Sequence, residues 1–86
     1  MQYIDSSIAI VGLGYVGLPL AVEFGSKRKV IGFDINEDRI KDLKKGIDNT
    51  LETTNEELKG ATHLSFTNCL EDIKDCKIFI ITVPTP

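Results

Sequence analysis

The stretch Gly12–Gly17 reads Gly-Leu-Gly-Tyr-Val-Gly and so has glycine at its first, third and sixth positions. It follows Ile8–Val11, a short apolar run rich in β-branched residues, which predicts a strand buried on both faces of a parallel sheet. An apolar stretch that reaches Phe24 comes next and predicts a helix. The glycine stretch is therefore predicted to be a tight turn between a strand and a helix.

The three glycines have separate physical roles at a phosphate-binding turn. Gly12 permits the tight turn, Gly14 lets the backbone approach a pyrophosphate closely, and Gly17 lets the helix pack against the strand. The N–H groups near Tyr15 and Val16, at the positive end of the helix dipole, then face the anion. A tight strand-to-helix turn that binds nothing is the alternative.

Asp34 ends the second predicted strand, seventeen residues after Gly17. A carboxylate at this place accepts hydrogen bonds from both hydroxyls of an adenosine ribose and repels a 2′-phosphate, which favours NAD over NADP. The alternative is a carboxylate that caps the following turn. Arg39 is placed to stack on the adenine or reach the ribose, although a solvated helix charge fits equally well. An arginine so close to Asp34 is also compatible with NADP as the cofactor.

Apolar runs and amphipathic segments alternate along the rest of the chain, as in βαβ units. Further strands are predicted at Val30–Asp34, Leu64–Phe66 and Lys77–Val83, the last of them strongly buried. The first predicted helix begins near Tyr15 or Val16 and ends between Gly25 and Lys27. The second is capped by Asn36, has an apolar face of Ile40, Leu43 and Ile47, and stops at Gly46. A short third helix runs from a capping box at Thr53 or Thr54 to Gly60, and a short fourth helix is capped by Asn68.

Four such strands joined by right-handed crossovers lie in the order 3-2-1-4. The predicted fold class is α/β, a partial Rossmann-type parallel sheet with flanking helices. The sheet stops where a second half is expected, so residues 1–86 are predicted to be the truncated N-terminal part of an NAD-binding domain. Thr85 follows the fourth strand, near the point where such sheets bind ligands. A plain turn is the alternative there.

Composition excludes several classes of function. Lys and Arg total 10 against 13 Asp and Glu, and the net charge of −3 argues against nucleic acid or an anionic membrane as a partner. The uncharged stretch Ser6–Val22 is too short and too rich in glycine to predict a membrane span. Cys69, Cys76 and the single His63 form no metal-ligand set, and two cysteines favour reduced thiols in a cytoplasmic protein.

Three segments resemble the beginning of the UDP-glucose/GDP-mannose dehydrogenase family: Gly12–Ala21 (Gly-Leu-Gly-Tyr-Val-Gly-Leu-Pro-Leu-Ala), Gly32–Asn36 (Gly-Phe-Asp-Ile-Asn) and Val83–Pro86 (Val-Pro-Thr-Pro). The resemblance runs along essentially the whole chain in order and spacing. Within the family, Leu18–Phe24 and Leu51–Thr54 are most similar to the UDP-N-acetylhexosamine 6-dehydrogenases of bacterial surface-polysaccharide synthesis, which act on the GlcNAc or GalNAc sugar.

The resemblance implies a two-step oxidation of the sugar C6 alcohol, through an aldehyde to a carboxylate, with reduction of two NAD molecules. A cysteine nucleophile carries the second step in family members, but it lies beyond Pro86, and neither Cys69 nor Cys76 matches its motif. No catalytic residue is therefore expected in this chain. The resemblance assigns cofactor contacts to Tyr15 and Val16 (pyrophosphate), Asp34 (ribose), Arg39 (adenosine side) and Thr85 (middle of the cofactor).

We therefore expect the NAD-binding part of a cytoplasmic nucleotide-sugar 6-dehydrogenase, inactive as an 86-residue chain. Its expected partners are NAD, a UDP-sugar bound mostly elsewhere, and further copies of itself, since the open edge of the fourth strand favours association. Two alternatives remain. One is a dehydrogenase of the hydroxyacid type, which has a similar glycine turn, and the other is a non-enzymatic sensor that binds a nucleotide to gate a partner.

Overall fold

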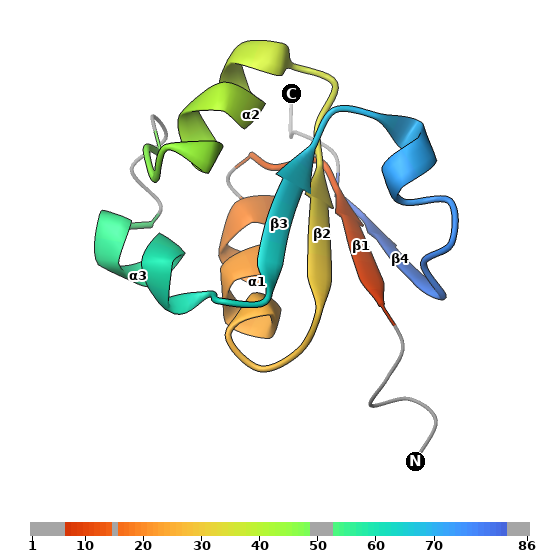
Figure 1. Ribbon diagram of the computed structural model, residues 1–86, viewed down its shortest axis with the longest axis horizontal. Coiled ribbons are helices and arrows are strands. Elements are labelled where there is room, and N and C mark those ends of the chain that lie inside the picture. The colour runs from red at the N-terminus through yellow and green to blue at the C-terminus, as the bar shows by residue number, and fades with distance from the viewer. Residues whose placement is uncertain (1–6, 15, 49–52, 83–86) are drawn as a thin grey trace.

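A computed structural model describes residues 7–14, 16–48 and 53–82 of the chain (Figure 1). One parallel sheet contains four strands in the order β3-β2-β1-β4. The strands are β1 (Ile8–Val11), β2 (Val30–Phe33), β3 (Leu64–Thr67) and β4 (Ile78–Ile81). The predicted Rossmann-type α/β class and the strand order 3-2-1-4 are confirmed.

The helices follow the strands in the order that the sequence predicts. They are α1 (Gly17–Gly25), α2 (Glu37–Lys44), α3 (Asn55–Gly60) and a single 3-10 turn, η2 (Leu70–Asp72). The helix α3 begins at the predicted capping box, in which the Thr54 hydroxyl accepts the Glu57 N–H and the Glu57 carboxylate accepts the Thr54 N–H. None of these helices in the described ranges is long and apolar enough to cross a membrane.

The larger hydrophobic core lies between the sheet and the three α-helices. Alternate strand side chains point to this face, and they pack with residues of α1, α2 and α3. The buried members are Ile8, Ile10, Leu13, Leu18, Ala21, Val30, Ile40, Leu43 and Leu58. A smaller cluster on the opposite face consists of Ala9, Phe33, Ile73 and Cys76. Leu13, the second residue of the glycine stretch, is thus anchored in the larger core.

Two local predictions are wrong for reasons of backbone geometry. Ile47 does not belong to the apolar face of α2: the helix ends at Lys44, and Gly46, the predicted stop, has a φ of 82°, so the chain turns away and leaves Ile47 43% exposed. Asn68 caps no helix: η2 begins after Cys69, and the N–H of Cys69 is accepted by the Thr67 hydroxyl.

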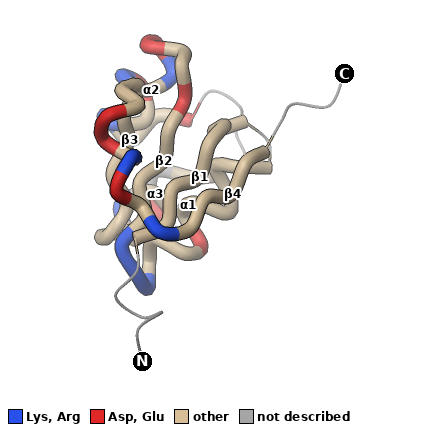
Figure 2. The backbone as a smooth tube through the Cα atoms, turned by 90° about the vertical axis from the view of Figure 1, so that its right-hand side faces the viewer, with Lys and Arg blue, Asp and Glu red and all other residues tan. Residues whose placement is uncertain are grey.

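The prediction that the fourth strand is strongly buried is also wrong. Phe79 is 47% exposed and Ile81 is 70% exposed. Both pair with β1 residues, Ala9 and Val11, on the face of the smaller cluster, which has no α-helix over it in the described part of the chain. Figure 2 shows no charged residue along β1 or β4 themselves, whereas charged residues lie on the helices and on the loop that leads into β4. An edge strand that has only one neighbour among the described strands keeps much of its apolar surface in solvent.

The cap of α2 yields a stability prediction. Asn36 precedes α2, and its side-chain oxygen accepts the Arg39 N–H at 3.1 Å. Asn36→Ala is expected to lower the free energy of unfolding by about 1 kcal/mol, because the N–H loses its acceptor. Urea unfolding followed by circular dichroism measures this change. Asn68→Ala, at an exposed position with no cap, is the control and should change stability by less than about 0.5 kcal/mol.

Candidate dinucleotide-binding site

Packing explains two of the three glycines in the turn between β1 and α1. Gly12 has a φ of 98°, in the region where side chains are strained, and a Cβ there would overlap the Thr82 carbonyl oxygen. At Gly17, a Cβ would overlap the carbonyl oxygen of Gly12. The N-terminus of α1 therefore lies directly against the end of β1, as the sequence predicts for this pair of glycines.

Gly14 differs from the other two. A Cβ built on it meets no atom within 4 Å, its φ lies outside the left-handed region, and the residue is exposed. The folded chain itself therefore has room for a side chain at Gly14. Open space beside the backbone at this point suits the close approach of a bound group, which is the role predicted for this glycine.

Backbone donors that have no partner in the described part of the chain lie beside this open space, at the start of α1. Val16 is the N-cap residue, and no side chain caps the helix. Among the described residues, the N–H groups of Gly14 and Val16 have no acceptor within the protein. Such donors, together with the positive end of the helix dipole, favour an anion. Tyr15, predicted as a second pyrophosphate contact, lies outside the described residues.

The structure brings the predicted ribose acid to this turn. One Asp34 carboxylate oxygen accepts the Leu13 N–H at 3.0 Å, and the other accepts the Asn36 N–H at 3.0 Å. The side chain thus supports the glycine turn and also closes the turn after β2, which was the alternative role. Each carboxylate oxygen accepts more than one hydrogen bond, so both retain acceptor capacity for ribose hydroxyls.

Arg39 does not behave as a solvated helix charge. Its side chain is only 11% exposed. Its Nε and Nη2 groups donate to the carbonyl oxygen of Leu13 at 2.9 and 2.6 Å, and its Nη1 lies 2.7 Å from a carboxylate oxygen of Asp48. The guanidinium therefore lies against the backbone of the glycine turn, on the side where the sequence places the adenosine.

Two residues that support the site were missed by the sequence reasoning. Asp48, in the loop after α2, is the partner of Arg39, and its side chain is fully buried. Thr82 follows β4, and its hydroxyl donates to the carbonyl oxygen of Gly12 at 2.9 Å. Neither belongs to the glycine motif. Thr82 contacts Gly12 across 70 positions in the chain, and Asp48 is linked to the turn through Arg39. The predicted contact at Thr85 lies outside the described residues.

Two cysteines lie among the described residues outside the glycine turn. Cys69 is exposed, and Cys76 is buried as a free thiol. Burial raises the pKa of Cys76, an effect that Lys29 opposes and Asp75 reinforces, so the reactive thiolate is disfavoured. Within residues 7–14, 16–48 and 53–82, no group of three or more metal-binding side chains occurs.

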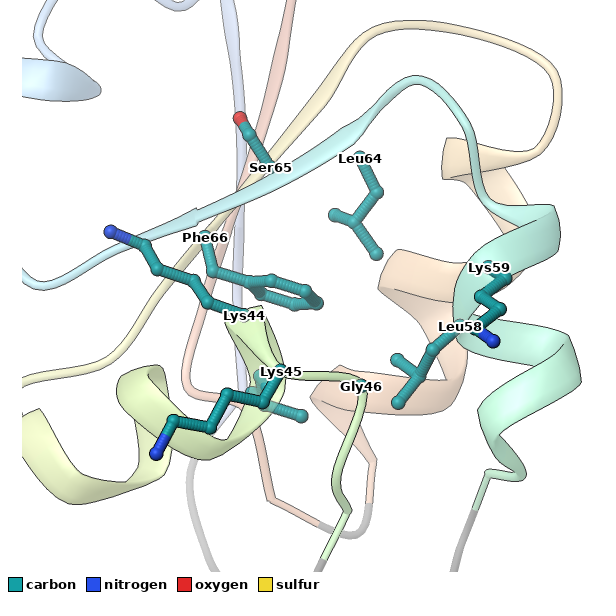
Figure 3. A pocket seen from close by; sticks show the side chains of 9 residues that line it. Lys44, Lys45, Gly46, Leu58, Lys59, Leu64, Ser65 and Phe66 are labelled. Atoms are coloured by element: carbon teal, nitrogen blue, oxygen red, sulfur yellow. The ribbon is translucent and has the colours of Figure 1, made fainter.

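A separate groove of about 580 Å³ lies between α2, α3 and β3 (Figure 3). Leu43, Leu58, Leu64 and Phe66 form its apolar lining, and three lysines stand around it. Figure 3 shows the ammonium groups of Lys44 and Lys45 directed away from the hollow. The groove shares no lining residue with the glycine turn, Asp34 or Arg39, so it is distinct from the candidate cofactor site.

The fold and the site together define a dinucleotide-binding domain. Its first strand enters a glycine turn at a helix N-terminus, and its second strand is followed directly by a carboxylate that contacts that turn. Residues 6–86 match the NAD binding domain of the UDP-glucose/GDP-mannose dehydrogenase family. The chain belongs to this family, and its cofactor is NAD.

Individual relatives agree with this assignment. The chain is 63% identical over 82 residues to UDP-N-acetyl-D-glucosamine 6-dehydrogenase of Pseudomonas aeruginosa and 65% identical over 82 residues to the Salmonella typhi protein of the same name, in each case over 95% of the chain. It spans 19% of the length of these relatives. The solved structure of UDP-D-ManNAc dehydrogenase from Pyrococcus horikoshii is similar to the chain, with a TM-score of 0.85 and 39% sequence identity. The match covers 93% of this chain and 20% of the Pyrococcus chain.

Proposed function

We propose that this chain is the NAD-binding part of a nucleotide-sugar 6-dehydrogenase. The whole protein oxidises the C6 alcohol of a UDP-N-acetylhexosamine to the uronic acid, reduces two NAD molecules, and supplies surface-polysaccharide synthesis from the cytoplasm. The identity of 63–65% to proteins named UDP-N-acetyl-D-glucosamine 6-dehydrogenase supports this substrate class. The chain spans only 19% of those relatives, so sugar binding and the cysteine chemistry are assigned to the rest of the protein.

The observation that carries the proposal is the junction of Asp34 with the glycine turn. Asp34 contacts the Leu13 N–H at 3.0 Å, and the exposed Gly14 lies directly after Leu13 with open space beside it. A carboxylate for a ribose and a backbone open to a pyrophosphate therefore lie close together, as one end of a dinucleotide requires. The residues present fit NAD.

Each part of the site has a definable task when NAD is bound. The N–H groups of Gly14 and Val16 would donate to the pyrophosphate, and Asp34 would accept from the ribose hydroxyls. NAD itself supplies the hydride acceptor. The part that we assign to this chain is the binding and orientation of the cofactor.

The test of the activity uses the whole protein that contains this chain. UDP-GlcNAc and UDP-GalNAc are supplied with NAD, and the absorbance of NADH is followed together with the sugar product. We expect two NADH formed for each uronic acid, and none from the 86-residue chain alone. Reduction of NAD by a hydroxyacid but not by a UDP-sugar would identify the hydroxyacid class. Cofactor binding without reduction by any of these substrates would identify the sensor.

We also infer that the chain associates with copies of itself through β4. Its only neighbour among the described strands is β1, and Phe79 and Ile81 present exposed apolar surface beside the open edge. Sedimentation velocity at increasing concentration should show dimers or larger species, and Phe79→Lys should reduce them. A monomer at every concentration contradicts the inference.

A further inference from the structure

Two peptide groups flank Leu13 in the glycine turn, and different side chains form hydrogen bonds with each of them. In the plane between Gly12 and Leu13, the carbonyl oxygen accepts the Thr82 hydroxyl at 2.9 Å and the N–H donates to Asp34 at 3.0 Å. In the plane between Leu13 and Gly14, the carbonyl oxygen accepts two N–H groups of Arg39. Among the described residues, Arg39 is the group that holds this second plane.

The orientation of the second plane decides where the Gly14 N–H points. A trans peptide is planar, so its N–H and C=O point in opposite directions. With the Leu13 carbonyl oxygen directed at Arg39, the Gly14 N–H is directed away from Arg39. Glycine adopts a wide range of backbone angles, so the Gly14 side of this plane offers little resistance to a flip. Arg39 therefore controls whether a donor or a carbonyl oxygen faces the open space.

Arg39 is itself held by a buried carboxylate. Asp48 has a side chain with 0% exposure, and one of its oxygens lies 2.7 Å from Nη1 of Arg39. The other oxygen accepts the N–H of Thr53 at 2.9 Å and its hydroxyl at 3.2 Å. A buried charge is stable only with such partners. The loop between α2 and α3 thus connects, through one ion pair, to the glycine turn.

We propose that the Asp48–Arg39 ion pair is the positioning device of the pyrophosphate-binding turn. Asp48 fixes the guanidinium of Arg39, Arg39 fixes the Leu13 carbonyl oxygen, and the Gly14 N–H is thereby kept available to the cofactor. Asp48 is a positioning residue, since its side chain is buried and its carboxylate contacts Arg39 and Thr53. The inference deepens the proposed function and rests on it for the identity of the bound anion.

The first test compares Asp48→Asn with Asp38→Asn in the 86-residue chain. Asp38 lies on α2, beside Arg39 in the sequence, and is exposed, so its variant makes the same change of charge without breaking the pair. Calorimetry should show NAD binding weakened about tenfold or more by Asp48→Asn and less than about twofold by Asp38→Asn, since an oriented donor to a charged group is lost only in the first. Equal NAD affinity in the two variants would overturn the proposal.

A second ligand separates positioning from a direct contact of Arg39. Adenosine has no pyrophosphate, so its weak binding, followed by NMR titration, should be the same in the parent and in Asp48→Asn. A parallel loss of adenosine affinity would show that Asp48 acts on the adenosine pocket and not on the glycine turn. That outcome would overturn the proposal while it leaves NAD binding by the parent intact.

A double variant separates positioning from stability. Asp48→Asn leaves a buried Arg39 without its carboxylate and lowers the stability of the fold, whereas replacement of a buried ion pair by apolar residues is often neutral. Arg39→Met with Asp48→Leu should therefore unfold at a higher urea concentration than Asp48→Asn and still bind NAD about tenfold or more weakly than the parent. If the double variant recovers both its stability and its NAD affinity, the Asp48–Arg39 ion pair has only a structural role.

A measurement without ligand keeps this inference distinct from the proposed function. The carbonyl carbon of Leu13 and the amide of Gly14 should change their NMR frequencies in Asp48→Asn and not in Asp38→Asn. If the parent binds no NAD while these signals respond, the proposed function fails and the control of the turn by the ion pair stands. If the signals do not respond, the ion pair does not position the turn.

Discussion

Gly17→Ala is expected to unfold the domain or to lower its free energy of unfolding by about 3 kcal/mol or more. A Cβ at this position would overlap the carbonyl oxygen of Gly12, which is backbone and is itself held by Thr82. Relief of the overlap requires α1 to move away from β1, and this movement would open the larger core around Leu18 and Ala21. A domain of this size is stable by only about 5–10 kcal/mol. Urea unfolding followed by circular dichroism measures the change.

Gly14→Ala is the matched control for this prediction. The same chemical change is made three residues earlier, where a Cβ meets no protein atom within 4 Å. Its free energy of unfolding should stay within about 0.5 kcal/mol of the parent, whereas its affinity for NAD should fall about tenfold or more, because the methyl group occupies the space of the pyrophosphate. A stable Gly17→Ala variant, or a Gly14→Ala variant with full NAD affinity, would contradict the division of roles among the glycines.

Asp34→Ala is expected to weaken NAD binding by about tenfold to a hundredfold. The carboxylate supplies charge-assisted hydrogen bonds to the ribose hydroxyls, and it also holds the Leu13 N–H at 3.0 Å. Calorimetric titration with NAD, ADP-ribose and NADP measures the loss. The parent should bind NAD and ADP-ribose with similar affinity and NADP more weakly, because the carboxylate repels a 2′-phosphate. In Asp34→Ala the difference between NAD and NADP should shrink.

Two controls make this result specific. Asp34→Ala also removes the acceptor of the Leu13 and Asn36 N–H groups, so its folded fraction is measured first and the titrations are made where the variant is folded. Asp38→Ala, at an exposed position on α2, should leave NAD affinity within about twofold of the parent. Unchanged NAD affinity in a folded Asp34→Ala variant would remove Asp34 from the site, and tight NADP binding by the parent would remove its role in selecting the cofactor.

Local patterns in the sequence were sufficient to predict the positions of the strands and of the glycine turn. Apolar runs with β-branched residues located β1, β2 and β4, and the weaker pattern Leu64–Phe66 located β3. The glycine spacing located the turn between β1 and α1. The Thr54 capping box was found because its partners are three residues apart and bond only within one helical turn. The errors at Ile47 and Asn68 arose where a helix end depends on the backbone beyond it. Gly46 predicted where the helix stops, but it did not show where the chain runs afterwards, and the short turn of η2 has no unique local signature.

The amino-acid sequence by itself determined that a glycine turn joins β1 to α1 and that Asp34 directly follows β2, because the backbone angle at Gly12 and the pattern of each strand are properties of adjacent residues. Only the tertiary structure decided what surrounds that turn. Asp48 meets Arg39 after the loop that follows α2 folds back, and Thr82 meets Gly12 after β4 pairs with β1. The exposure of Phe79 has the same origin, since burial depends on which elements cover a strand and not on how apolar the strand is.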